Sequence, residues 1–184
     1  MPAFVFAILA VAWLAWMVPF FLVKRGPAAQ TLDRRARWGI VLEAIGFAIV
    51  WQKPVWIAQP GVWRIVMGVV SLAFGPLLTW TSALALGRQW RFDAGLNADH
   101  QLVQSGAYRL VRHPIYTSML CMLIGTGLLL ARLPLLVVAI AFFIAGTEIR
   151  VRIEDRLLAA RFGAAFDDYR RHVHAYVPFL NARR

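Results

Sequence analysis

The sequence is poor in the residues that build disulfides, metal centres and acidic surfaces. Its single cysteine, Cys121, lies inside an apolar run, which excludes a disulfide within the chain and a cysteine-based metal site. The 4 histidines include no helix-spaced pair inside an apolar run. The sequence also has no Gly-rich phosphate loop, internal repeat or low-complexity tract. We therefore predict that the chain holds no metal ion.

Long apolar runs dominate what is present. Hydrophobic residues make up 60% of the 184 residues, and the mean hydropathy is +0.62. Residues 2–23, 38–58 and 61–86 are long enough to span a membrane as helices, and residues 115–131 and 134–148 form two shorter runs with a tight turn between them. The sequence therefore predicts an all-α, polytopic membrane bundle with about five transmembrane helices, the last two forming a helical hairpin.

The formal net charge of +11 raises the question of nucleic-acid binding, which the positions of the charges answer. In a five-span arrangement, all but three of the 20 basic residues fall on one side, the exceptions being Lys53, Arg64 and Arg132. This asymmetry follows the positive-inside rule and predicts an outside N-terminus and a cytoplasmic C-terminus, with no nucleic-acid partner. The first run has no basic residue before it, so we expect a retained helix rather than a signal peptide.

Residues 102–118, LVQSGAYRLVRHPIYTS, concentrate polar and aromatic side chains directly before the fourth apolar run. Pro114 suits the first turn of a helix and disfavours helical geometry at His113, so we expect a helix to begin at Pro114. The start of a helix presents unpaired N–H groups and a positive dipole end. With Arg112 and two tyrosines beside it, this end is predicted to hold a carboxylate-bearing ligand.

The chain after the tight turn is predicted to continue as one helix from residue 134 to about 162, about 43 Å long, and to project beyond the membrane. Gly163 is a plausible stop for this helix, and a short second helix follows. Glu154 lies at the border of the apolar face of the long helix, where it can contact a ligand; the alternative is a surface pair with Arg150. Glu43, an acid inside the second run, is either functional or close enough to the membrane edge to reach water or a loop arginine.

Two motifs together resemble the signature of the isoprenylcysteine carboxyl methyltransferase family, within the wider membrane methyltransferase superfamily that includes phospholipid methyltransferases. The first combines Leu102-Val103, Gly106 and Tyr108 with Arg112-His113-Pro114-Ile115-Tyr116, and the second combines Glu154-Asp155 and Leu158 with Phe162-Gly163, Tyr169 and Pro178. The resemblance covers about residues 86–180. Ser118 and Asp155 depart from it, standing where the family usually has a glycine and a second glutamate.

The resemblance implies an integral membrane enzyme that uses S-adenosylmethionine to methylate a lipid-like or prenylated acceptor embedded in the membrane. Residues 1–86 then form the N-terminal transmembrane helices, and residues 87–184 form the loop, hairpin and C-terminal helices of the cofactor-binding region. The eighteen arginines against two lysines point to a GC-rich bacterial genome and hence an inner membrane. The resemblance implies catalytic roles for Arg112 and Glu154, and cofactor contacts for Leu102, Val103, Gly106, Tyr108, His113, Pro114, Tyr116, Glu154 and Asp155.

Several readings of the function stay open. The acceptor can be a prenylated-cysteine carboxylate, an isoprenoid, a thiol or a phospholipid headgroup. An ionised carboxylate needs no general base, whereas an amine headgroup needs one, and His113 and the acids are the candidates. Arg112 can bind either the cofactor carboxylate or the acceptor carboxylate. A related dinucleotide-dependent sterol-type reductase is a second class of function, and a non-catalytic membrane protein with the same fold is a third.

Overall fold

The structure is a computed structural model, and it describes residues 1–23, 31–89, 95–96 and 101–176. Its six helices are α1 (Ala3–Leu22), α2 (Ala36–Trp51), α3 (Val62–Leu86), α4 (Pro114–Leu130), α5 (Leu133–Phe162) and α6 (Ala164–His172). Three short 3-10 helices, η1 (Lys53–Val55), η2 (Gly87–Gln89) and η3 (Gly106–Arg109), occur in the connections. The predicted all-α fold is confirmed; the strands are a single antiparallel pair of two residues each, β1 (Thr31–Leu32) and β2 (Gly95–Leu96).

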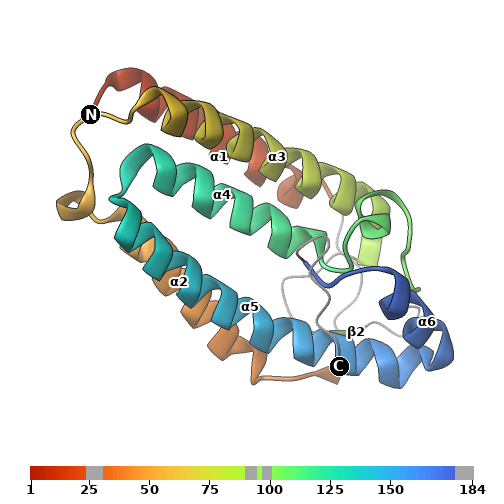
Figure 1. Cartoon of the computed structure of the whole chain (residues 1–184). Helices are drawn as coiled ribbons and strands as arrows, with labels where there is room; N and C mark the ends of the chain where they lie inside the picture. The colour runs from red at the N-terminus through yellow and green to blue at the C-terminus, as the bar shows by residue number, and fades with distance from the viewer. Residues whose placement is uncertain (24–30, 90–94, 97–100, 177–184) are drawn as a thin grey trace.

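The five long helices lie side by side, with α6 and the strand pair at one end (Figure 1). The opposite end holds the N-terminus, the α2–α3 connection and the α4–α5 turn. With an odd number of long helices, the N-terminus and the segment that follows the last of them lie at opposite ends of the bundle. Within the described residues, three helices are long and apolar enough to cross a membrane: Ala3–Leu22, Val62–Gln89 and Leu133–Phe162. The 17-residue α4 is a shorter apolar helix, and α2 has 16 residues. Five complete crossings therefore stay a prediction.

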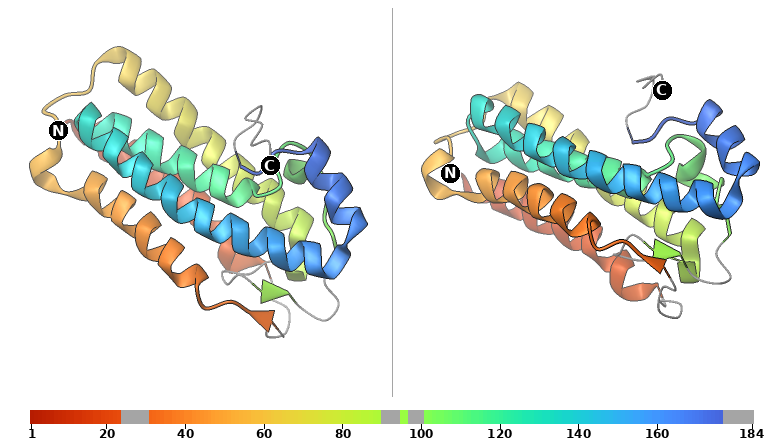
Figure 2. Two further views of the ribbon diagram at one scale, coloured as in Figure 1. Left: turned by 60° about the horizontal axis from the view of Figure 1, so that its bottom comes forward. Right: turned by 90° about the horizontal axis from the view of Figure 1, so that it is seen from below.

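The helices pack in pairs that are distant in the sequence. Helix α2 lies along α5, and α3 lies along α4, whereas α4 and α5 diverge from their shared turn (Figures 1 and 2). Glycines permit the close approach in both pairs. A Cβ on Gly46 would lie 2.7 Å from the backbone oxygen of Ala139 on α5, and a Cβ on Gly125 of α4 would lie 2.9 Å from the backbone oxygen of Gly68 on α3.

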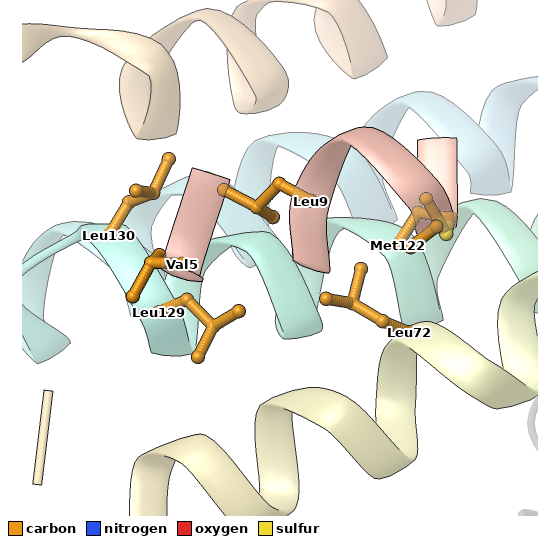
Figure 3. Close-up of a cluster of buried hydrophobic side chains, with 7 residues drawn as sticks. Val5, Leu9, Leu72, Met122, Leu129 and Leu130 are labelled. Atoms are coloured by element: carbon orange, nitrogen blue, oxygen red, sulfur yellow. The ribbon is translucent and has the colours of Figure 1, made fainter. Parts of the chain in front are cut away.

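An apolar core holds α1 against α3 and α4. Val5 and Leu9 of α1 meet Leu72 of α3 and the α4 residues Met122, Leu129 and Leu130, all of them buried (Figure 3). The outer faces of α1 and α3 carry exposed large apolar side chains, among them Leu14 and Phe21 of α1 and Leu84 of α3. A helix that is apolar on both its packed and its open face suits a lipid environment.

At the end of the bundle that holds the N-terminus, Arg64 explains one exception to the charge asymmetry. Its guanidinium is buried, and it donates to the backbone oxygens of Leu128 at 2.7 Å, of Gly127 at 3.2 Å, and of Ala131. These carbonyls lie at the C-terminal end of α4, which carries the negative end of the helix dipole; the Gly127 oxygen also accepts from the backbone N–H of Ala131 at 2.8 Å. Arg64 therefore caps α4 instead of marking the cytoplasmic side.

Candidate active site

A cavity of about 480 Å³ is lined by residues of α1, α2, α4 and α5, by the segment before α4 and by Tyr169 of α6. Its lining combines aromatic and aliphatic side chains with a small set of charged ones. The lining residues that carry the argument below are Trp13, Trp16, Phe47, Glu43, Leu102, Val103, Tyr108, Arg112, His113, Tyr116, Arg150 and Glu154.

The start of α4 forms where Pro114 predicts it. His113 is its N-cap residue, with φ −126° and ψ 64°, outside the helical region. The backbone N–H groups of Arg112 and His113 each donate, at 2.7 Å, to the oxygens of His174 and Ala175. Residues 173–176, which we call the C-terminal strap, thus run beside this helix start.

This strap corrects one expectation. The N–H groups before the helix donate to the strap, and those of Tyr116 and Thr117 donate to the backbone oxygen of His113. These donors are used inside the protein, so the anion-binding capacity of this end comes from side chains rather than from a bare helix terminus.

His113 lies between two carboxylates of α5. Its Nε2 is 2.8 Å from Asp155 Oδ1, and its Nδ1 is 3.2 Å from Glu154 Oε2. Each ring nitrogen therefore carries a proton and donates to a carboxylate, which makes the imidazole cationic. Burial opposes this charge, but the hydrogen bonds to Asp155 and Glu154 outweigh it and raise the pKa of His113 to about 9.

Arg112 holds the C-terminal strap and the second acid. Its Nη2 donates to Asp155 Oδ2 at 2.7 Å, and its Nη1 donates to the backbone oxygen of Val173. The guanidinium carbon lies 6.0 Å from the centre of the Phe166 ring of α6. Arg112 thus connects α4, α5, α6 and the strap at the wall of the cavity.

A second chain of contacts leads from Glu154 to α2. The hydroxyl of Tyr116 donates to Glu154 Oε1, and the guanidinium of Arg150 lies 4.8 Å from the centre of the Tyr116 ring. Arg150 Nη1 in turn donates to Glu43 Oε2 at 2.9 Å, and the hydroxyl of Thr147 donates to Glu43 Oε1 at 3.0 Å. Three acids and three cations therefore form one continuous polar network around the cavity.

This network corrects two readings of the sequence. Glu154 and Arg150 do not form a surface pair, because Arg150 is buried: Glu154 contacts His113 and Tyr116, and Arg150 pairs with Glu43. Glu43 does not reach water or a loop arginine; it is 2% exposed and meets an arginine of α5. The physical reason is the close pairing of α2 with α5 through their glycines.

The predicted site residues differ in their relation to the cavity. Leu102, Val103, Tyr108, Arg112, His113, Tyr116 and Glu154 line it. Asp155 lies behind His113 and Arg112. Gly106, with φ +60°, begins η3 and packs near Thr81 and Ala85 of α3, and Pro114 begins α4; the lining includes neither of them. Pro178 lies outside the described residues.

The sequence analysis assigned no site role to the lining residues Trp13, Trp16, Phe47 and Arg150, and it left the role of Glu43 open. The aromatic ones lie in apolar helices, where tryptophan and phenylalanine are ordinary residues. Glu43 and Arg150 carried a usable signal, because each is a charge in or next to an apolar run, and such charges are expected to pair.

Ser118, one of the two departures from the family pattern, is a structural polar contact below the cavity. It is fully buried, and its Oγ donates to the backbone oxygen of Ile115 at 2.7 Å. Ser118 Oγ also accepts hydrogen bonds from Trp16 Nε1 at 3.2 Å and from the hydroxyl of Thr79 at 2.8 Å. Ser118 therefore ties α1, α3 and α4 together and helps to place the Trp16 ring in the cavity wall.

Comparisons with known proteins agree with this architecture. The phospholipid methyltransferase family matches residues 63–165. The cobalt-zinc-cadmium resistance protein CzcN of Cupriavidus metallidurans is 35% identical over 67% of this chain and 65% of its own length. A probable protein-S-isoprenylcysteine O-methyltransferase of rice (Oryza sativa subsp. indica) is 29% identical over 62% of this chain and 61% of its own. Protein-S-isoprenylcysteine O-methyltransferase B of Arabidopsis thaliana is 29% identical over 65% of this chain and 61% of its own.

The chain thus spans less than two thirds of the length of these relatives. The matched family region begins in α3 and ends in α6, and it contains all of α4 and α5, including the pair of acids around His113. The resemblance found in the two sequence motifs is confirmed. The chain belongs to the phospholipid methyltransferase family of membrane proteins.

Proposed function

We propose that the protein is an integral membrane methyltransferase that uses S-adenosylmethionine to methylate a carboxylate on a lipid-like or prenylated acceptor. The observation that carries the proposal is a cavity with a charged end on α4 and α5 and an aromatic end on α1 and α2. A cavity of this kind suits a polar donor beside an acceptor with an apolar chain.

The charged end fits the cofactor. S-adenosylmethionine carries a carboxylate, an ammonium group, a sulfonium and a flat adenine, and it supplies an electrophilic methyl group. Glu154 would take the ammonium or ribose, and His113 with Arg112 would face the carboxylate. Leu102, Val103 and Tyr108 provide apolar and aromatic wall for the adenine. These residues bind and orient, which is most of what an in-line methyl transfer requires.

The aromatic end fits an acceptor that is dissolved in the membrane. Trp13, Trp16 and Phe47 come from helices whose outer faces are apolar, and they line the same cavity as the charged residues. Arg150 is the cation on this side, near the Tyr116 ring. We assign it to the carboxylate of the acceptor, since Arg150 pairs with Glu43 beside the apolar wall, whereas Arg112 pairs with Asp155 on the cofactor side.

The state of His113 favours a carboxylate acceptor over an amine. An amine headgroup must lose a proton to a base in order to be methylated, whereas a carboxylate is already ionised at neutral pH. Both nitrogens of His113 lie at hydrogen-bond distance from acids, and its pKa is raised to about 9, so His113 is a poor base at neutral pH. The other candidate bases, Glu154 and Asp155, are already paired with His113 and Arg112. The site thus supports O-methylation of a carboxylate better than N-methylation of a phospholipid headgroup.

Methyl transfer from a labelled cofactor tests this function. We would supply the purified protein with an S-prenylated N-acetylcysteine, its carboxamide, or vesicles that contain phosphatidylethanolamine. We expect base-labile label, as in a methyl ester, on the free carboxylate and none on the carboxamide. Label on phosphatidylethanolamine instead would overturn the choice of acceptor.

Binding separates the other classes of function. Calorimetry is expected to show S-adenosylhomocysteine binding and no binding of NADPH. The reverse result would favour a sterol-type reductase, and binding of neither would favour a non-catalytic member of the fold.

A further inference from the structure

We propose that Glu43 of α2 is a positioning residue for methyl transfer, acting through Arg150 to orient the carboxylate of the acceptor. This inference rests on the proposed function and extends it to a helix outside the matched family region of residues 63–165. The proposal therefore gives a residue in the N-terminal half of the chain a role in methyl transfer.

Glu43 is fully engaged by α5. One carboxylate oxygen accepts from the hydroxyl of Thr147 at 3.0 Å, and the other accepts from Arg150 Nη1 at 2.9 Å. Glu43 is 2% exposed, and a buried acid of this kind requires partners to stay ionised. Its geometry is consequently fixed before any ligand enters the cavity.

The Arg150 side chain is positioned from three sides. Its aliphatic stem crosses Gly39 of α2 so closely that a Cβ there would lie 2.4 Å from Arg150 Cγ. The guanidinium lies 4.8 Å from the centre of the Tyr116 ring, and Glu43 holds its Nη1. Two of the three constraints, Gly39 and Glu43, come from α2 and lie one helical turn apart.

The position of this pair in the cavity connects it to the acceptor. Glu43 and Arg150 both line the cavity, together with Phe47, which lies one turn further along α2. The polar network continues from Arg150 across the Tyr116 ring to Glu154 on the cofactor side. A carboxylate held by Arg150 is therefore placed between the apolar wall and the proposed methyl donor.

The charge of Glu43 has a second effect. It offsets the charge of Arg150, so the pair attracts an acceptor carboxylate less strongly than a lone arginine would. Glu43 thus lowers the affinity of Arg150 for the acceptor carboxylate in the ground state, but it fixes the orientation of the guanidinium. This arrangement predicts a change in turnover and not a loss of acceptor binding when the charge is removed.

Glu43→Gln tests the proposal against Glu148→Gln as a matched control. Glu148 is also an acid of the same kind paired with an arginine, Arg152, but that pair is exposed, and the other carboxylate oxygen of Glu148 accepts from the Tyr176 hydroxyl at 3.3 Å. We expect Glu43→Gln to lower kcat about tenfold or more on the carboxylate acceptor, because a misoriented acceptor reacts slowly. The KM and calorimetric Kd of the acceptor should stay equal or fall, and S-adenosylhomocysteine affinity should stay within about twofold.

Three outcomes would overturn the proposal. A rise in the acceptor KM with unchanged kcat would make Glu43 a direct acceptor contact. Equal losses of cofactor affinity, turnover and folded fraction would make it a structural residue. A full Glu43→Gln effect in an Arg150→Lys background would show that Glu43 does not act through Arg150. If the wild-type protein transfers no methyl group to a carboxylate, the proposed function fails independently of these variants.

Discussion

His113 shows how two acids can decide the protonation of a buried imidazole. A buried histidine is normally neutral, because charge is costly away from water. Here Glu154 and Asp155 each accept from one ring nitrogen, and the pKa of His113 rises from 6.5 to about 9. The imidazolium in turn lets two adjacent acids of one helix point into the same site.

The raised pKa predicts a loss of stability at alkaline pH. Protonation of His113 stabilises the folded state relative to the unfolded state by on the order of 3 kcal/mol. This stabilisation is fully present below about pH 6.5 and is lost as the pH rises through about 9. Thermal unfolding in detergent from pH 6 to 10 should show the wild-type Tm falling across that window. The fall should be much smaller for His113→Gln, whereas His172→Gln, at an exposed position, should follow the wild type. Parallel curves for His113→Gln and wild type would contradict a charged His113.

Glu154 gives a second residue-scale prediction, on cofactor affinity. If its carboxylate contacts the cofactor, Glu154→Gln should remove a charge-assisted hydrogen bond of about 1.5–3 kcal/mol and lower S-adenosylhomocysteine affinity or turnover by about tenfold to a hundredfold. Glu148→Gln, which weakens the exposed pair with Arg152 and the long hydrogen bond from the Tyr176 hydroxyl, should cost tenths of a kcal/mol. Calorimetry and kinetics of the two variants check this expectation. Equally small changes in affinity and turnover for the two variants would show that Glu154 does not contact the cofactor.

At the scale of the helices, the sequence predicted the elements far better than their partners. The apolar runs and Pro114 located α1, α3, α4 and α5 to within a few residues. The second apolar run, residues 38–58, is interrupted by Gln52, Lys53 and Pro54, and α2 ends just before this interruption, at Trp51, where Lys53 and Pro54 turn the chain into η1.

The helix pairs themselves could not be predicted from one sequence. The tight turn at Arg132 suggested that the last two spans pack together. They do so near the turn, where Gly127 meets Leu136, but α5 lies more extensively along α2. Lipid-facing and protein-facing sides are equally apolar, so hydropathy does not distinguish them. Because the pairing of α2 with α5 could not be predicted, the contact between Glu43 and Arg150 could not be predicted either. The signal that remains is the glycine spacing, with Gly39 and Gly46 lying on one face of α2.

This glycine face predicts a stability effect separate from catalysis. Gly46→Ala would place a Cβ 2.7 Å from the backbone oxygen of Ala139, so α2 and α5 must separate. Overpacking of this kind costs about 1–3 kcal/mol, which should lower the Tm of the detergent-solubilised protein.

The control for Gly46 is Gly61→Ala at the exposed start of α3. Its new Cβ would meet nothing nearer than the Trp63 side chain at 3.7 Å. The Tm of this variant should change little. Equal Tm values for Gly46→Ala and Gly61→Ala would contradict close packing of α2 against α5.

The whole molecule has two unlike ends. The cavity, α6 and the C-terminal strap lie toward one end, and the turns that carry Lys53 and Arg132 lie at the other (Figure 1). With Arg64 capping α4, one of the three basic residues at the second end has a structural explanation. The remaining charge asymmetry predicts that the cavity end faces the cytoplasm. That side is where a soluble cofactor would have to enter.

Cysteine labelling tests this orientation. In a Cys121→Ala background, single cysteines at Arg34 and Arg171 report on the cavity end, and one at Lys53 reports on the other; all three positions are exposed. An impermeant thiol reagent added to intact cells should label position 53, and it should reach positions 34 and 171 only after the membrane is opened. Labelling at 53 is the internal control for reagent access. Labelling of 34 or 171 from outside would put the His113–Glu154 end of the cavity away from the cytoplasm, and cytoplasmic S-adenosylmethionine could then not supply the reaction.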